Sequence, residues 1–211
     1  MMDIVWIFDI IGIIAFAISG FLVGIRKQFD ILGVAIMSAI TSFGGGIIRD
    51  AIVSRMPFVF TFYYPSITLF VVFIFCMIFR RLINDKLEQK ILFIVMDAIG
   101  LVAFAISGTL LAIDMDFNLF GVVILSFIAA VGGSITRDVI INEIPLLLRS
   151  EIYGIIAIYC ALILFIYSYF FDEYNIYIIS FVSISAFVLR IIAYIRKWKL
   201  PMLPQHYKQD S

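Results

Sequence analysis

The chain contains one decisive stretch twice. Residues 9–20 read Asp-Ile-Ile-Gly-Ile-Ile-Ala-Phe-Ala-Ile-Ser-Gly, and residues 97–108, at an offset of 88, read Asp-Ala-Ile-Gly-Leu-Val-Ala-Phe-Ala-Ile-Ser-Gly. The same offset aligns Gly-Gly-Gly-Ile-Ile-Arg-Asp at 44–50 with Gly-Gly-Ser-Ile-Thr-Arg-Asp at 132–138, and 24 of the 49 pairs from residue 9 to residue 57 are identical. Shared apolar composition would not also align the glycines and the Arg-Asp pair. The sequence therefore contains an internal duplication.

Both copies belong to a strongly apolar chain. Of its 211 residues, 64% are hydrophobic and 14% are charged, and the mean hydropathy is +1.15. An ordinary soluble domain carries about a quarter charged residues, so this composition excludes a water-soluble enzyme. Lys plus Arg and Asp plus Glu both number 15, which gives no basic excess that would indicate nucleic acid as a partner. We expect an integral membrane protein whose surroundings are the lipid bilayer.

Apolar runs of about 20 residues, the length that crosses a bilayer, recur seven times. They cover residues 4–25, 31–53, 57–79, 91–113, 119–141, 152–171 and 176–195. Each copy then holds three spans, and because three is odd, the second copy must be inverted relative to the first. We predict an all-α membrane protein with seven transmembrane helices. Its parts are two inverted three-helix repeats at 4–88 and 89–173, a seventh helix at 174–196 and a cytoplasmic tail at 197–211.

Cations are distributed unevenly between the two sides of this bundle. With seven spans, one side holds only Arg49 and Arg55, and the other holds the remaining 13 of the 15 Lys and Arg residues. The positive-inside rule assigns the richer side to the cytoplasm. We expect a multi-pass protein of the cell (inner) membrane, with its N-terminus outside and its C-terminus in the cytoplasm. The tail, which contains His206, is expected to fray, the alternative being contact with anionic headgroups.

Two clusters of small residues fall near the middle of the second and fifth spans. Their members are Gly44, Gly45, Gly46, Gly132, Gly133 and Ser134. Glycine costs about 1 kcal/mol relative to alanine in a helix interior, so we expect a kink or a break at both clusters. Backbone groups freed by a break are tolerated in lipid only inside protein or along a water-filled path. Close helix packing is the alternative, and it is the favoured interpretation for Gly20, Gly24 and Gly108.

Six charged residues are expected inside the spans, near the two ends of such a path. They are Asp9, Arg49, Asp50, Asp97, Arg137 and Asp138. Asp9 and Arg49 lie at similar depths, and the duplication places their counterparts at the matching depth near the opposite face. Each mouth sums to a formal charge of minus one, which favours cations over anions. A structural clamp, in which each arginine pairs with an aspartate, stays equally open.

Hydroxyl groups near the glycine clusters offer uncharged oxygen ligands. They belong to Ser19, Thr41, Ser42, Ser107 and Thr136. Each could coordinate a partly dehydrated monovalent ion or satisfy a neighbouring backbone carbonyl. The sequence has one histidine, no cysteine cluster and no glycine-rich phosphate loop, and Cys76 and Cys160 lie within apolar runs. We therefore expect no enzyme, no catalytic residue, no metal site and no cofactor other than a transiently bound monovalent cation.

The chain resembles the prokaryotic branch of the trimeric intracellular cation (TRIC) channels, also catalogued as an uncharacterised or "glycine transporter" membrane domain. The resemblance runs from Asp9 to about Arg196 and rests on Ala-Phe-Ala-Ile-Ser-Gly followed by Gly-Gly-Gly-x-x-Arg-Asp, with Ser134 departing from the triplet. It implies a seven-helix protomer, a homotrimer, and one pore per protomer that conducts K+ with Na+ beside kinked second and fifth helices. The fifth helix is then expected to bend less. Two alternatives are an alternating-access carrier of a small zwitterion such as glycine and a non-transporting membrane scaffold.

Overall fold

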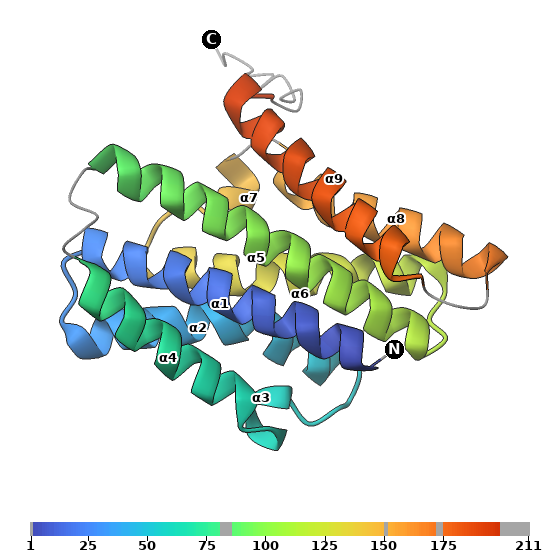
Figure 1. Cartoon of the computed structure of the whole chain (residues 1–211), viewed down its shortest axis with the longest axis horizontal. Helices are drawn as coiled ribbons and strands as arrows, with labels where there is room; N and C mark the ends of the chain where they lie inside the picture. The colour runs from blue at the N-terminus through green and yellow to red at the C-terminus, as the bar shows by residue number, and fades with distance from the viewer. Residues whose placement is uncertain (1, 81–85, 150–151, 172–174, 199–211) are drawn as a thin grey trace, which may run out of the picture.

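The computed structural model describes residues 2–80, 86–149, 152–171 and 175–198, and all regular structure in these residues is helical (Figure 1). The helices are α1 (Met2–Arg26), α2 (Ile31–Ile52), α3 (Phe58–Thr61), α4 (Tyr64–Phe79), α5 (Lys86–Asp114), α6 (Leu119–Ile140), α7 (Leu146–Arg149), α8 (Tyr153–Phe170) and α9 (Ile176–Arg196). The tail with His206 lies outside the described residues. Six helices, namely α1, α2, α5, α6, α8 and α9, are long and apolar enough to cross a membrane.

The third apolar run forms two helices instead of the single span expected over residues 57–79. The short α3 ends where Phe62 is extended, with φ −119° and ψ 150°. α4 then has 16 residues, and Pro65 stands in its first turn, where a missing N–H removes no helical hydrogen bond. The prediction of one continuous span is wrong here, because Pro65 lies in the first turn of a new helix and residues 62 and 63 separate that helix from α3. α5 also begins earlier than expected, at Lys86 rather than Ile91.

Local structure repeats at the same offset of 88 as the sequence. The Asp30 side chain caps α2 by accepting from the Gly33 N–H at 2.7 Å, and Asn118 caps α6 by accepting from the Gly121 N–H at 2.9 Å. The four residues of α3 have their counterparts in the four residues of α7. Left-handed backbone follows α1, α2, α5 and α6 at Gln28, Ser54, Asp116 and Asn142. The duplication is therefore conserved down to the ends of the helices.

Counterpart helices of the two copies meet at the centre of the molecule. α1 packs against α5 and α2 against α6, and Figure 1 shows α1 and α5 side by side, running in opposite directions. The rings of Phe16 and Phe104 stack with centroids 5.5 Å apart. A Cβ added at Gly100 would meet the Phe16 ring, and one added at Gly12 would meet the Phe104 ring. Each glycine thus makes room for the phenylalanine of the other copy.

The outer helices differ between the copies. α4 packs against α1, and its counterpart α8 packs against α5. α9 has no counterpart, and it lies on α5 and α8, where Ile179, Val182 and Ala186 are fully buried in an apolar cluster that contains Leu110 and Leu164. The second half is therefore covered by one helix more than the first.

Two buried arginine–aspartate clusters form the candidate functional site

The first cluster joins α1, α2 and α5 around the guanidinium group of Arg49. Arg49 Nη1 and Nη2 donate to the two carboxylate oxygens of Asp9 at 2.7 and 3.1 Å, and Nε donates to Asp50 Oδ1 at 2.9 Å. Ser107 accepts from Arg49 and donates to Asp9. All four residues have an exposed fraction of 0%. Two-pronged charge-assisted bonds of this kind hold a planar guanidinium in one orientation.

The segment after α2 folds back over this cluster. The backbone N–H of Phe58, at the start of α3, donates to Asp50 Oδ2 at 2.8 Å. The centroid of the Phe58 ring lies 5.5 Å from Arg49 Cζ, within range of a cation–π contact. Both oxygens of Asp50 therefore have partners, and an aromatic ring covers the arginine.

The second cluster reproduces this plan at the offset of 88. Arg137 Nη1 donates to Asp97 Oδ1 at 2.8 Å and to Ser19 Oγ at 2.7 Å, and Nε donates to Asp138 Oδ1 at 2.8 Å. The backbone N–H of Leu146 donates to Asp138 Oδ2 at 2.8 Å. Each arginine thus bonds the serine of the opposite copy. Arg49 of the first copy bonds Ser107 of the second, and Arg137 of the second copy bonds Ser19 of the first. Each cluster therefore contains side chains from both halves and holds the two halves together.

The side chains around the second arginine–aspartate cluster differ from those around the first. Leu146 stands where the first copy has Phe58, and the ring beside Arg137 is instead Phe93, at 4.9 Å. Arg137 Nη2 has no hydrogen-bond partner among the described residues, and Asp138 is 4% exposed. The second arginine is therefore held by fewer bonds than the first.

A third arginine approaches the second cluster from α9. Arg190 is 3% exposed, and its Cζ lies 4.7 Å from the ring centroid of Tyr153. Tyr153 in turn interacts electrostatically with Asp97, Arg137 and Arg190. From the sequence, Arg190 is expected only among the cations of the cytoplasmic side, and its place beside Tyr153 is not predicted. The one available signal was its position inside an apolar run, before the end of the seventh span.

The glycine clusters lie where α2 and α6 cross, and both helices are continuous through them. A break, one form of the expectation, is absent because no helical residue is lost, whereas a kink stays a prediction. The missing side chains allow close contact between the two helices. A Cβ on Gly45 would stand 2.1 Å from the carbonyl oxygen of Ala129, and one on Gly133 would stand 2.1 Å from that of Thr41. The contacts at Gly20, with Met37 O 2.5 Å from an added Cβ, confirm the packing interpretation there as well.

The second glycine cluster has Ser134 where the first has Gly46, and this difference has a structural explanation. A Cβ on Gly46 would lie 2.3 Å from the Phe58 ring. The second copy has Ser134 and Leu146 at the matching positions, so no ring occupies the space that glycine must leave free. The Ser134 hydroxyl donates to the carbonyl of Val131 at 2.9 Å. Glycine at this position therefore follows from the phenylalanine opposite it.

Most of this chain resembles proteins already grouped in one family. A family model described as "Glycine transporter" matches residues 6–81 and 94–169, which include both copies of the repeat. The membrane protein YvgT of Bacillus subtilis is 35% identical over 200 residues, which cover 92% of this chain and 93% of that protein. The ranges matched by the family model include every residue of the two arginine–aspartate clusters.

Solved structures share the fold. One, described as "a prokaryotic TRIC channel in 0.5 M KCl", has a TM-score of 0.86 and 32% identity, and the match covers 95% of this chain and all of that one. Another, described under "conductance through TRIC cation channels", has a TM-score of 0.82 and 36% identity over 95% of this chain and 98% of that one. The chain belongs to the prokaryotic TRIC family. Both neighbours are channels rather than enzymes, in keeping with a non-enzymatic membrane protein.

In this TRIC-family chain, the candidate ion-contacting hydroxyls divide into two groups. Thr41 donates to the carbonyl of Met37 at 2.6 Å, and Thr136 donates to that of Gly132 at 2.8 Å. Ser42 bonds the carbonyl of Ala39 in the same way, at 3.1 Å. These three satisfy their own helices, the alternative that the sequence left open, whereas Ser19 and Ser107 bond the arginines. Their contact with ions stays a prediction.

Unpaired polar atoms lie beside both clusters of this TRIC-family chain. Within the described residues, Trp6 Nε1, Tyr64 Oη and Arg137 Nη2 have no hydrogen-bond partner. Tyr64 interacts electrostatically with Asp9 and Arg49, and Tyr153 with Asp97 and Arg137. Buried polar groups are bonded to protein or to ordered water. Ordered water would supply the partner that these atoms lack among the described residues.

Proposed function

We propose that this protein is a monovalent cation channel that conducts K+ and Na+ through a path in each protomer beside α2 and α6. The observation that carries the proposal is the likeness to solved structures described as TRIC channels, with TM-scores of 0.86 and 0.82 at 32% and 36% identity. The protein assembles as a homotrimer in the cell (inner) membrane. Seven spans form two inverted repeats and a last helix, with the N-terminus outside and the C-terminus in the cytoplasm.

Charge supports a path for cations. Each cluster contains two aspartates for one arginine, held at full or nearly full burial inside membrane-length helices. Ionisable groups at this depth are costly and mark pathways or paired structural elements. The net negative charge of each mouth attracts cations, and the unpaired polar atoms beside both clusters provide for water. A bend at the glycine clusters, without loss of helix, would open the crossing of α2 and α6.

The reversal potential of the purified full-length chain tests this function. The protein is reconstituted in a planar bilayer separating two KCl concentrations, and unitary currents are recorded. We expect currents that reverse near the K+ equilibrium potential and persist when Na+ replaces K+. Reversal at the Cl− potential, or absence of unitary currents from protein that is folded and trimeric, would overturn the proposal.

Neutralising one aspartate in each cluster separates conduction from clamping. Asp9→Asn and Asp97→Asn are compared for trimer yield and for unitary conductance, with Asp3→Asn, at an exposed position of the same first helix, as the control. Lost current with unchanged trimer yield assigns the carboxylate to the path. Lost assembly assigns it to the clamp that fixes Arg49 or Arg137.

A carrier of a small zwitterion is the second candidate, because the matching family model is described as "Glycine transporter". A carrier that alternates access between its two halves would give saturable glycine uptake and accelerated exchange against internal glycine in proteoliposomes, with no unitary currents. A channel gives unitary currents and no glycine counterflow. The same preparation therefore decides between the two functions.

A further inference from the structure

Two aromatic rings separate the arginine–aspartate clusters along the contact between α1 and α5. The pairs of residues that lie together at this contact, from the first cluster to the second, are Asp9 and Ser107, Gly12 and Phe104, Phe16 and Gly100, and Ser19 and Asp97. The first and last pairs are polar and bond the arginines. The two pairs between them consist of glycine and phenylalanine.

The layer between the clusters is apolar on both helices. Asp9 and Ser19 belong to different clusters and lie ten residues apart on α1, which is ~15 Å of helix at about 1.5 Å per residue. Residues 10–18, between them, are all apolar, and so are residues 98–106 of α5. The two phenylalanine rings of this layer are 0% exposed and stack with centroids 5.5 Å apart. Hydrophobic constrictions close channels by excluding water, and this layer has the composition of one.

The crossing of α2 and α6 lies at the level of the same layer. α1 packs on α2 and α5, and α6 packs on the same two helices, so the four surround a common centre. Gly45 lies four residues before Arg49 on α2, and Gly133 lies four residues before Arg137 on α6. Because these glycines contact the opposite helix, the crossing is midway between the arginines. Phe43 of α2 packs against the apolar cluster that contains both rings.

We propose that Phe16 and Phe104 form a hydrophobic gate, which closes the cation path between the two clusters until the rings move apart. This inference rests on the proposed channel function, which requires a path from one cluster to the other. A path through the centre of the four helices passes the layer of the rings. A cation in that layer would lose its water without gaining an oxygen ligand. The stacked rings therefore correspond to a closed state of the path.

Removing either ring tests the gate. Full-length Phe16→Ala and Phe104→Ala are purified, checked for trimer yield and recorded in planar bilayers. We expect the ratio of closed to open time to fall about tenfold, because each truncation removes contacts that only the closed state makes. Phe104→Leu keeps the layer apolar and should change the ratio little. Phe104→Asn has a side chain of the same branched shape but is polar, and it should open the path as alanine does.

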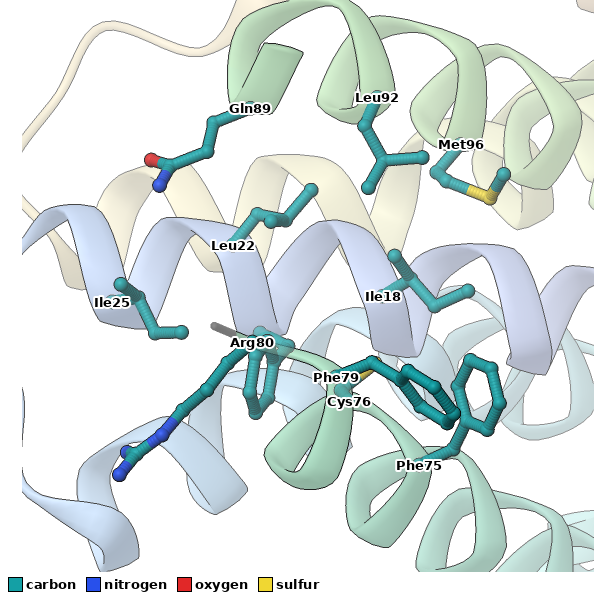
Figure 2. A pocket seen from close by; sticks show the side chains of 11 residues that line it. Ile18, Leu22, Ile25, Phe75, Cys76, Phe79, Arg80, Gln89, Leu92 and Met96 are labelled. Carbon is teal, nitrogen blue, oxygen red and sulfur yellow. The ribbon is translucent and has the colours of Figure 1, made fainter. Parts of the chain in front are cut away.

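A phenylalanine outside the path is the matched control. Another face of α1 lines a groove with α4 and α5, in which Figure 2 shows Ile18 and Leu22. Phe21 lines the same groove and is 3% exposed. Phe21→Ala therefore removes a buried ring from the same helix and should leave the ratio of closed to open time unchanged.

Osmotic water permeability separates the gate from the channel function. Proteoliposomes of the same variants are shrunk in a stopped-flow experiment, which reports the passage of water whether or not ions pass. Faster shrinkage with Phe104→Asn than with Phe104→Leu supports the gate, even if no variant gives unitary currents and the channel proposal fails. This comparison also decides if neither alanine variant assembles. Equal permeability of the Asn and Leu variants, or a Phe21→Ala variant that opens the path as Phe104→Ala does, would show that the rings only pack the helices.

Discussion

The two arginine–aspartate clusters have the same ion pairs and differ in the residues that pack over them. Arg49 uses Nε, Nη1 and Nη2 and lies under the Phe58 ring. Arg137 leaves Nη2 unbonded among the described residues, and Tyr153 and Arg190 approach from α8 and α9. Losing one member of a buried ion pair leaves an uncompensated charge, so the ion pairs cannot drift after duplication. The residues that pack over the two clusters do differ, with Phe58 over Arg49 and with Phe93 and Tyr153 beside Arg137.

The difference in cover is also a difference in charge. The first cluster has two aspartates and one arginine, a formal sum of minus one, and the second has the same sum before Arg190 is counted. With Arg190 beside Tyr153, the second group becomes formally neutral. A single helix outside the repeat therefore makes the surroundings of the two clusters electrostatically unequal.

Removing the arginines should have the largest effect and an unequal one. Arg49→Met leaves Asp9 and Asp50 buried without their cation, and we expect the free energy of unfolding to fall by about 3–5 kcal/mol. Arg137→Met should cost about 1 kcal/mol less, since Arg137 makes fewer bonds. Unfolding in detergent–SDS mixtures measures both. Equal losses would contradict the inference that the second cluster is the looser one.

A larger side chain at the crossing of α2 and α6 should lower the free energy of unfolding equally from either helix. Gly45→Val and Gly133→Val each place a side chain against a backbone carbonyl 2.1 Å from the Cβ position, and we expect a loss of about 3 kcal/mol for each. Gly121→Ala is the control, since the atoms nearest to its Cβ belong to the Phe117 side chain, the first at 3.1 Å. The same unfolding assay applies. Tolerance of either valine would show that the crossing is not held this tightly.

Sequence reasoning found the elements that recur at one offset and missed those that depend on contact. Asp9 and Arg49 could be matched by depth, because a charge inside an apolar run must find a partner. The exchange of Ser19 and Ser107 between clusters could not, since an offset states which residues are equivalent and not which ones touch. At the glycine clusters the sequence could not decide between a kink, a break and close packing, because all three favour the same residue.

The unrepeated part of the chain was the hardest to predict. No second copy exists against which α9 could be compared, so Arg190 was counted only with the cations of one side. The split of the third span between α3 and α4 was missed because apolar content does not show where a helix begins. Here Pro65 gave the signal, and its position in the first turn of α4 is what the structure adds.

Giving the second cluster the aromatic ring of the first should show that Ser134 and Leu146 are coupled. Leu146→Phe introduces a ring at the position that Phe58 has in the first copy. Phe58 lies against Gly46, whereas the new ring would lie against Ser134. We expect a loss of about 2 kcal/mol from overpacking. Adding Ser134→Gly should restore most of it. A double variant as unstable as the single one would break the proposed correspondence of the two covers.

The smallest expected effect is on current, and it tests the charge difference directly. In the proposed channel, Arg190→Gln gives the second mouth the net charge of the first, so cation current through that mouth should rise about twofold at low ionic strength and rectification should decrease. Arg190→Lys should retain the original rectification, and Arg196→Gln, exposed at the end of α9, is the control for a change of charge alone. If Arg190→Gln and Arg196→Gln shift the rectification equally, the buried arginine has no specific electrostatic role, and the two mouths differ only in packing.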